Sequence, residues 1–192
     1  DALHLSYMLA NLEPGDEVIA PVFTCTATNI PFLYMGVKIN FADIDPETMN
    51  IDVSHVRQLM NQNVKAIVCV HYGGLPCDMD ELQLIADEWG VPIIEDAAHA
   101  VGAKYKGVNV GSISDFTMFS FQAIKHITTG DGGMLVSNND ELVKDYITLE
   151  DLKKINIATN KKGGFSRITK WVLKTRIAEI KSVLENNNTW KD

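Results

Sequence analysis

The sequence predicts an α/β fold: a three-layer sandwich in which helices cover both faces of a mostly parallel β-sheet with one antiparallel strand. From residue 1 to about residue 149, helix-like segments alternate with strand-like segments. The strand-like segments are apolar at almost every position, which is typical of parallel strands buried on both faces. With 192 residues, of which 46% are hydrophobic and 22% charged, the chain is long enough to build one substantial core.

The first elements follow from hydrophobic periodicity. Apolar residues spaced as i, i+3, i+4 and i+7 predict an amphipathic helix near the start of the chain. These residues are Leu5, Met8, Leu9 and Leu12. Residues 13–16 end this helix, and the turn Asp43–Pro46 closes the second of the strands that follow. Three apolar runs are predicted strands: Val18–Val22, Val37–Ala42 and Val64–Val70.

A second helix and three further strands are predicted beyond residue 77. Asp78 and Glu81 are expected to cap a helix whose apolar stripe runs from Leu82 to Trp89, and Gly90 ends it. The strands are Val91–Ile94, Phe116–Ser120 and Gly133–Ser137. Only about a dozen residues separate the last two strands, too few for a comfortable crossover helix. The last strand is therefore expected to run antiparallel beside its predecessor.

The chain is expected to divide into three parts. Residues 1–149 form the large α/β domain, whose natural start is expected to be missing because Asp1 already lies within a helical pattern. Residues 150–165 are polar and rich in lysine, as in a linker. Apolar residues at helical spacing predict a helical segment over residues 166–192.

The charge pattern argues against some classes of partner. Acidic residues outnumber basic ones by 25 to 17, which gives a net charge of −8. A nucleic-acid or anionic-membrane surface normally shows a basic stripe, and the sequence has none. No apolar run reaches the length of a membrane span, and the first residues show no signal-peptide pattern. We therefore expect neither nucleic acid nor membrane as a partner.

The cysteines indicate the compartment and raise the question of a metal. Cys25, Cys69 and Cys77 are an odd number in a core-building sequence, which fits a reduced, cytoplasmic location better than a disulfide framework. Cys69, His71, Cys77 and Asp78 could suggest zinc. Their spacing matches no standard pair of ligand pairs, and Cys69 lies within an apolar strand. The sequence predicts no metal site.

Four polar residues are expected at the sheet edge where ligands bind in open α/β folds. Asp96 closely follows a predicted strand, and His99 comes three residues later. Ser120 ends the next strand, and Lys125 lies five residues further on, in the loop. Each has an ordinary structural interpretation: a cap for a helix over residues 97–101, a partly buried histidine, a strand-end hydroxyl and a surface lysine. Together they form a candidate active site.

These residues belong to an ordered series of motifs. The motifs are Gly15–Ile19, Phe23–Thr24, Asp43–Pro46, Asp78–Asp80, Asp96–Ala100, Gly111–Ser112, Asp115, Ser120–Lys125 and Gly130–Gly133. In order and spacing, the series resembles the DegT/DnrJ/EryC1/StrS family of sugar aminotransferases, which depend on pyridoxal 5′-phosphate (PLP). The resemblance runs from residue 1 to about residue 148 and covers most of the family's large domain, which has the fold of type I PLP-dependent transferases.

The resemblance implies a role for each candidate residue. Lys125 would form the Schiff base with PLP and then move a proton between the substrate and the cofactor. Asp96 would pair with the ring nitrogen and keep it protonated. His99 matches a position that contacts the ring or its 3′-oxygen, and Ser120 matches a serine that helps to hold the phosphate. Cys25 would border the ring.

The implied activity is the transfer of an amino group, with glutamate as the expected donor, to a nucleotide-linked keto-sugar. Such reactions supply cell-surface polysaccharides or secondary metabolites. The resemblance also implies PLP as cofactor and a homodimer with shared active sites.

Two departures from the family pattern affect the cofactor site. Cys25 occupies a position that is commonly aromatic and stacks on the ring, and a cysteine offers much less ring contact. The family's Gly-Thr phosphate motif would fall just before Asp1, so one phosphate anchor at a helix N-terminus is expected to be absent from this chain.

Three alternatives remain open. Sugar dehydratases of the same fold carry histidine in place of the Schiff-base lysine, whereas this chain has Lys125 followed by His126. A nucleotide-binding oxidoreductase needs a glycine-rich turn between a strand and a helix, and residues 130–133 precede a strand instead. A truncated, non-catalytic relative that acts as a binding module is the third.

Overall fold

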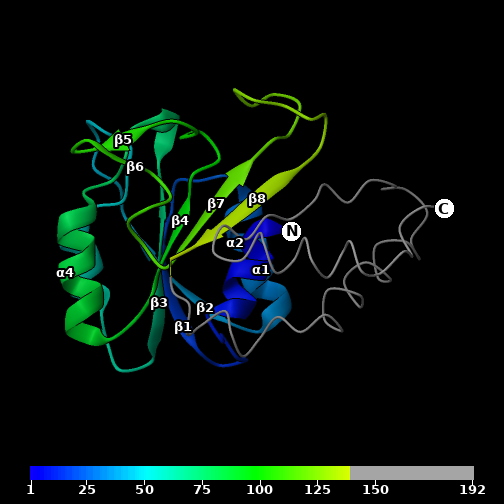
Figure 1. The fold of residues 1–192 in the computed structure, drawn as a ribbon. Coiled ribbons are helices and arrows are strands. Elements are labelled where there is room, and N and C mark those ends of the chain that lie inside the picture. The colour runs from blue at the N-terminus through cyan, green and yellow to red at the C-terminus, as the bar shows by residue number, and fades with distance from the viewer. Residues whose placement is uncertain (139–192) are drawn as a thin grey trace.

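The computed structural model of the protein describes residues 1–138, which form a six-stranded sheet flanked by helices (Figure 1). The strands of this sheet are β1 (Glu17–Pro21), β2 (Lys38–Ala42), β3 (Val64–Val70), β4 (Ile93–Asp96), β7 (Phe116–Ser120) and β8 (Gly133–Ser137). Their order across the sheet is β2-β1-β3-β4-β7-β8. Neighbouring strands are parallel except for β7 and β8, which pair antiparallel from Phe116↔Ser137 to Ser120↔Gly133. The predicted antiparallel strand is confirmed.

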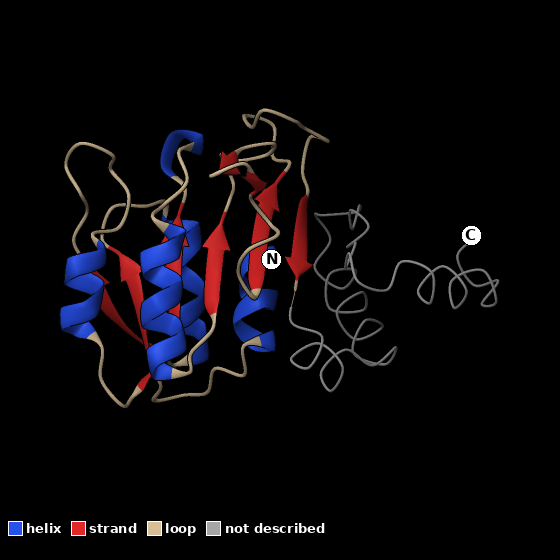
Figure 2. Cartoon of the chain, turned by 60° about the vertical axis from the view of Figure 1, so that its left-hand side comes forward, coloured by secondary structure: helices blue, strands red, loops and turns tan. Residues whose placement is uncertain are grey.

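Four α-helices cover the two faces of the sheet (Figure 2). They are α1 (Ala2–Leu9), α2 (Thr26–Met35), α3 (Val53–Leu59) and α4 (Met79–Trp89). The apolar side chains of α1 and α2 share a core with Ile94, whereas those of α3 and α4 share a core with Ile93. Because side chains alternate along a strand, β4 contributes to both cores. The predicted three-layer sandwich is therefore confirmed over the described residues.

The remaining elements are short. A 3-10 helix spans Tyr72–Gly74, and the strands β5 (Lys104–Tyr105) and β6 (Val108–Asn109) form a separate hairpin. Lys106 and Gly107 between them both have positive φ angles, of 47° and 88°. Positive φ at both central residues is the conformation that a tight two-residue hairpin requires.

Some predicted boundaries were wrong. The first helix ends at Leu9 rather than near Leu12, since Asn11 adopts a left-handed φ of 56°. Leu12 is nevertheless buried, so the apolar pattern predicted correctly that this side chain is buried, but not where the helix ends. The strand predicted over Val91–Ile94 is β4, and it extends through two acidic residues to Asp96.

The predicted cap of α4 was also wrong. Asp78 occupies the N-cap position, but its side chain makes no capping hydrogen bond. Asp78 Oδ1 instead accepts a hydrogen bond from the Tyr105 hydroxyl of the β5–β6 hairpin, at 2.7 Å. At the other end of the helix, Gly90 adopts the left-handed conformation at the C-cap, as a helix stop requires.

Two predictions concern residues beyond the described part. The linker over residues 150–165 and the helical segment over residues 166–192 lie outside the described residues. Within residues 1–138, none of the helices is long and apolar enough to span a membrane.

Candidate active site

Asp96 is the last residue of β4, and its side chain lies on the α1–α2 face of the sheet. It is only 5% exposed. Its Oδ2 accepts a hydrogen bond from the Thr28 hydroxyl of α2 at 2.7 Å, and its Oδ1 accepts one from the Ala98 backbone N–H at 3.1 Å. The residues after Asp96 form a turn rather than the helix considered for residues 97–101. The carboxylate is thus held from two sides at the carboxyl end of the sheet.

His99 lies in this turn and is half-buried. Burial, followed by the positive charge of Lys125, lowers the pKa of His99, while the Asp96 carboxylate acts in the opposite direction. The imidazole is therefore mainly neutral at pH 7. His99 follows the end of β4 by three residues, so it lies at the same edge of the sheet as Asp96.

Lys125 lies in the loop between β7 and β8, which extends beyond the edge of the sheet at the top of Figure 1. Its backbone N–H donates to the Gln122 carbonyl at 2.9 Å, in a turn that follows the end of β7. Ser120 ends that strand, and its Oγ accepts a hydrogen bond from the Gln122 N–H at 3.4 Å. Because β7 pairs with β4 in parallel, Ser120 and Asp96 emerge at the same edge.

Cys25 lies at the same edge, at the N-cap position of α2. Its side chain is an exposed free thiol. Aromatic contacts are made instead by Phe23 and Tyr72, whose ring centroids are 5.2 Å apart, and the Tyr72 ring centroid lies 6.3 Å from that of His99. This aromatic pair was missed in the sequence because Phe23 follows β1, whereas Tyr72 lies in the 3-10 helix after β3.

The 3-10 helix that contains Tyr72 packs closely against the turn that contains His99. A Cβ atom on Gly74 would lie 2.8 Å from the His99 carbonyl oxygen, and Gly74 has a φ of 88°. The buried Asn50 holds this segment from the other side, since its Oδ1 accepts the Tyr72 N–H at 3.0 Å. Its amide group donates to two carbonyls, those of Leu75 and Pro76. Neither Asn50 nor Gly74 was predicted to support the site.

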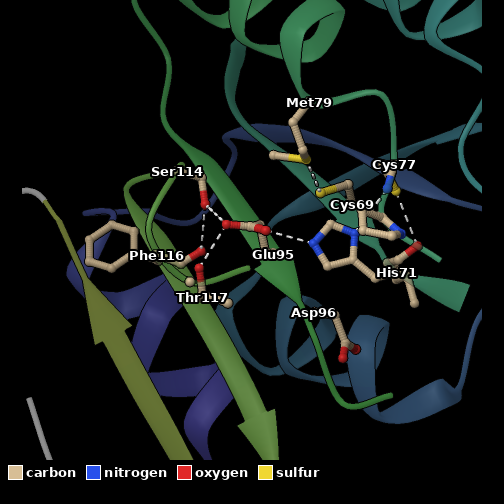
Figure 3. Close-up of polar contacts among 12 residues, drawn as sticks. Cys69, His71, Cys77, Met79, Glu95, Asp96, Ser114, Phe116 and Thr117 are labelled. Carbon is tan, nitrogen blue, oxygen red and sulfur yellow. Dashed lines mark hydrogen bonds and ion pairs between the residues drawn. The ribbon is translucent and has the colours of Figure 1, made fainter. Parts of the chain in front are cut away.

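A second polar cluster lies on the opposite face of β4, where Glu95 points toward His71 while Asp96 points away (Figure 3). Glu95 Oε2 and His71 Nε2 are 2.6 Å apart, and both side chains are fully buried. Glu95 Oε1 accepts hydrogen bonds from the hydroxyls of Ser114 and Thr117. Because His71 Nδ1 accepts the backbone N–H of Cys77, the proton of this imidazole is on Nε2, which donates to Glu95. Burial raises the pKa of Glu95, but the hydrogen bonds from His71 and the two hydroxyls outweigh burial and lower it, so an ionised carboxylate faces a neutral imidazole.

Three metal-ligand side chains meet beside this pair. The ligand atoms of Cys69, His71 and Cys77 all lie within 4.8 Å of one another, closer than their sequence spacing suggested. Each already has a protein partner: His71 Nδ1 accepts the Cys77 N–H at 3.1 Å, Cys77 Sγ lies 3.2 Å from the Val70 carbonyl, and Cys69 Sγ lies 4.0 Å from Met79 Sδ. The cluster is a hydrogen-bonded part of the core, and the expected absence of a metal site stays a prediction.

Comparison with known proteins identifies the family. The profile of the DegT/DnrJ/EryC1/StrS aminotransferase family matches residues 1–185, well beyond the residue near 148 at which the recognisable motifs end. The chain belongs to this family. Among curated relatives, it is 43% identical over 141 residues to the GDP-perosamine synthase of Escherichia coli O157:H7, covering 73% of this chain and 39% of the relative. The spore coat polysaccharide biosynthesis protein SpsC of Bacillus subtilis is also 43% identical, and 36% of it is covered.

Solved structures of the family give the same picture. An aminotransferase from Psychrobacter cryohalolentis superposes with a TM-score of 0.71 at 39% identity, over 73% of this chain and 36% of that one. The PLP form of the sugar aminotransferase Spr1654 from Streptococcus pneumoniae gives 0.69 at 33% identity, over 80% and 42%. These likenesses confirm the predicted fold, that of the large domain of type I PLP-dependent transferases. The chain spans less than half the length of these relatives.

The residues at the sheet edge fit the functional groups of PLP. A nearly buried carboxylate suits a protonated ring nitrogen, and the Asp96 carboxylate has no ion-pair partner among residues 1–138. Lys125 on the neighbouring loop can form a covalent bond with the aldehyde of PLP, and the neutral imidazole of His99 can pack against the face of the ring. Relatives with PLP in their structures belong to the same family as this chain.

Proposed function

We propose that this chain forms the cofactor-binding part of a PLP-dependent aminotransferase that transfers an amino group from glutamate to a nucleotide-linked keto-sugar. The observation that carries the proposal is the placement of three residues at the carboxyl edge of the sheet: Asp96 ends β4, His99 lies in the turn after it, and Lys125 lies in the loop after β7. Family membership supports the reaction class, and relatives such as GDP-perosamine synthase support a sugar substrate. The choice of glutamate and of a nucleotide-linked sugar rests on the family resemblance.

The three residues have complementary tasks. Bound PLP supplies an electron sink that stabilises negative charge on the substrate carbon. Lys125 would hold the cofactor through its side-chain amine, and the same amine would move a proton at that carbon. Asp96 accepts a hydrogen bond from the protonated ring nitrogen, and its two protein donors keep the carboxylate in place for this contact. His99 faces the ring as a neutral group, which adds no second positive charge near Lys125.

Ser120 and Cys25 complete the proposed cofactor site. The hydroxyl of Ser120 can donate to a phosphate oxygen, since the hydrogen bond that it makes with Gln122 uses Oγ only as an acceptor. Cys25 borders the ring without stacking on it. Tyr72 lies beside His99 and Phe23 beside Tyr72, so these two aromatic side chains can supply apolar surface at this edge.

We further propose that the site is completed in a homodimer. Several apolar side chains remain exposed at this edge, among them Phe23 at 41%, Ile124 at 83% and Ile127 at 55%. Exposed apolar groups gathered around a binding site are typical of surfaces that another protein segment covers. The proposed cytoplasmic location rests on the cysteines Cys25, Cys69 and Cys77, all of which are free thiols.

A half-reaction tests the proposed function. The full-length protein is loaded with PLP and mixed with glutamate, and conversion of the bound cofactor to its amino form is followed by chromatography after release. Wild type should convert PLP, whereas Lys125→Ala should not. Wild-type protein that binds PLP but converts none of it with any amino donor would contradict an aminotransferase and favour the dehydratase or binding-module alternatives.

A further inference from the structure

The buried hydroxyl of Thr28 lies directly behind the Asp96 carboxylate. We infer that Thr28 is a positioning residue that orients this carboxylate toward the ring nitrogen of PLP, and the inference rests on the proposed function. Thr28 is fully buried, and its hydroxyl oxygen is 2.7 Å from Asp96 Oδ2. The two residues are 68 positions apart in the sequence, so the contact is made by the fold and not by a local turn.

The hydrogen bonds leave the carboxylate free on one side. Thr28 and the Ala98 N–H each donate to one oxygen, whereas a carboxylate can accept about four hydrogen bonds. Asp96 also differs from Glu95, its neighbour on the strand, which is paired with His71. Among residues 1–138, no Lys, Arg or His forms an ion pair with Asp96. The remaining acceptor capacity is therefore available to a cationic group of a ligand.

The hydroxyls of Thr24 and Thr28 form a chain of hydrogen bonds that leads to Asp96 and has one direction. The Thr24 and Thr28 hydroxyls are 2.9 Å apart, and either could donate to the other by geometry alone. A hydroxyl has only one proton, and Thr28 uses its proton for Asp96. Thr24 must therefore donate to Thr28, so that both O–H dipoles point toward the carboxylate and stabilise its negative charge.

The backbone of Thr28 is fixed by a tyrosine of α1. The Tyr7 hydroxyl donates to the Thr28 carbonyl at 2.9 Å, and the Tyr7 ring stacks on Phe32 of α2 with centroids 4.1 Å apart. Burial, and then the charge of Asp96, raise the pKa of Tyr7 well above its ordinary value. Tyr7 therefore keeps its proton and remains a donor, which holds Thr28 in place on the helix.

Variants of two threonines separate positioning from stability. Thr28→Val keeps the shape and removes the hydroxyl, whereas Thr28→Ser keeps the hydroxyl. Thr117→Val is a matched control, because Thr117 is equally buried and donates to a carboxylate, that of Glu95, on the opposite face at 2.8 Å. Three properties of the full-length protein are measured. They are the equilibrium affinity for PLP, the visible circular dichroism signal per mole of bound PLP, and the unfolding temperature without cofactor.

Thr28→Val should weaken PLP binding by about tenfold or more, the scale of one lost hydrogen bond to a charged group. It should also reduce the visible dichroism at saturating PLP, since the ring is no longer held in one orientation. Thr28→Ser should restore both readouts to within about twofold of wild type, as expected when the hydrogen bond is kept. Thr117→Val should lower the unfolding temperature and leave both cofactor readouts unchanged.

The inference is overturned if Thr28→Val matches wild type in both cofactor readouts, or if Thr28→Ser is as impaired as Thr28→Val. It is also overturned if Thr117→Val has the same effect on the cofactor. Should Thr28→Val not fold, Thr24→Val replaces it: removing this more exposed donor should weaken PLP binding in the same direction, and unchanged binding would contradict the inference. Wild-type protein that binds no PLP would instead refute the proposed function, and with it this inference.

Discussion

The buried Glu95 carboxylate, which accepts a hydrogen bond from His71, predicts that the protein loses stability as the pH falls. Burial raises the pKa of Glu95, but hydrogen bonds from His71, Ser114 and Thr117 outweigh burial and hold the pKa below its ordinary value. A carboxyl group with a lowered folded pKa stabilises the protein fully above its unfolded pKa, and this contribution is lost as the pH falls through the folded pKa. A folded pKa that is one unit lower than the unfolded pKa corresponds to about 1.4 kcal/mol of stability.

The test compares wild type with a variant in which both partners are neutral, His71→Gln combined with Glu95→Gln. The free energy of unfolding of both proteins is measured in urea at pH values from 7 to 3, followed by far-ultraviolet circular dichroism. The stability of wild type relative to the double variant should fall by about 1 kcal/mol or more as the pH drops over this range, because only wild type gains a proton at Glu95. A relative stability that stays constant, or that rises as the pH falls, would refute an ionised Glu95.

Two further predictions concern the supports of the cofactor site. Asp96→Asn should keep the fold and lose most of the half-reaction rate, since the ring nitrogen then faces no anion, and near-normal rates would show that the carboxylate has another role. Glu95→Gln, on the other face of the same strand, is the control, because it should reduce stability without this loss of rate. Gly74→Ala should destabilise the protein by about 1 kcal/mol or more, since an alanine at a φ of 88° is strained. It should also weaken PLP binding by displacing the His99 turn, and unchanged thermal unfolding and PLP affinity would contradict the close approach.

The sequence predicted best what depends on local pattern. Val64–Val70, Phe116–Ser120 and Gly133–Ser137 were predicted to the residue, because apolar runs bounded by turn residues identify buried strands. Asp96 and Lys125 were placed at the correct edge for the same reason, since they follow such strands.

The helix α2 shows why the rest could not be predicted. It contains Pro31, and its outer face exposes Leu33 at 71% and Tyr34 at 79%, so its apolar residues do not follow one helical stripe. Thr28 lies in this helix, and its hydrogen bond to Asp96 joins residues that only the tertiary fold brings together. No local sequence pattern identifies Thr28 as the partner of Asp96, and none predicts the contact between Gly74 and His99.

The lysine that carries the cofactor can be identified directly. The full-length protein is loaded with PLP, reduced with borohydride and digested, and the modified peptide is identified by mass spectrometry. We expect a single reduced adduct on Lys125, the loop lysine whose charge acts on His99 beside Asp96. An adduct on a different lysine, or bound PLP with no adduct on any lysine, would contradict it.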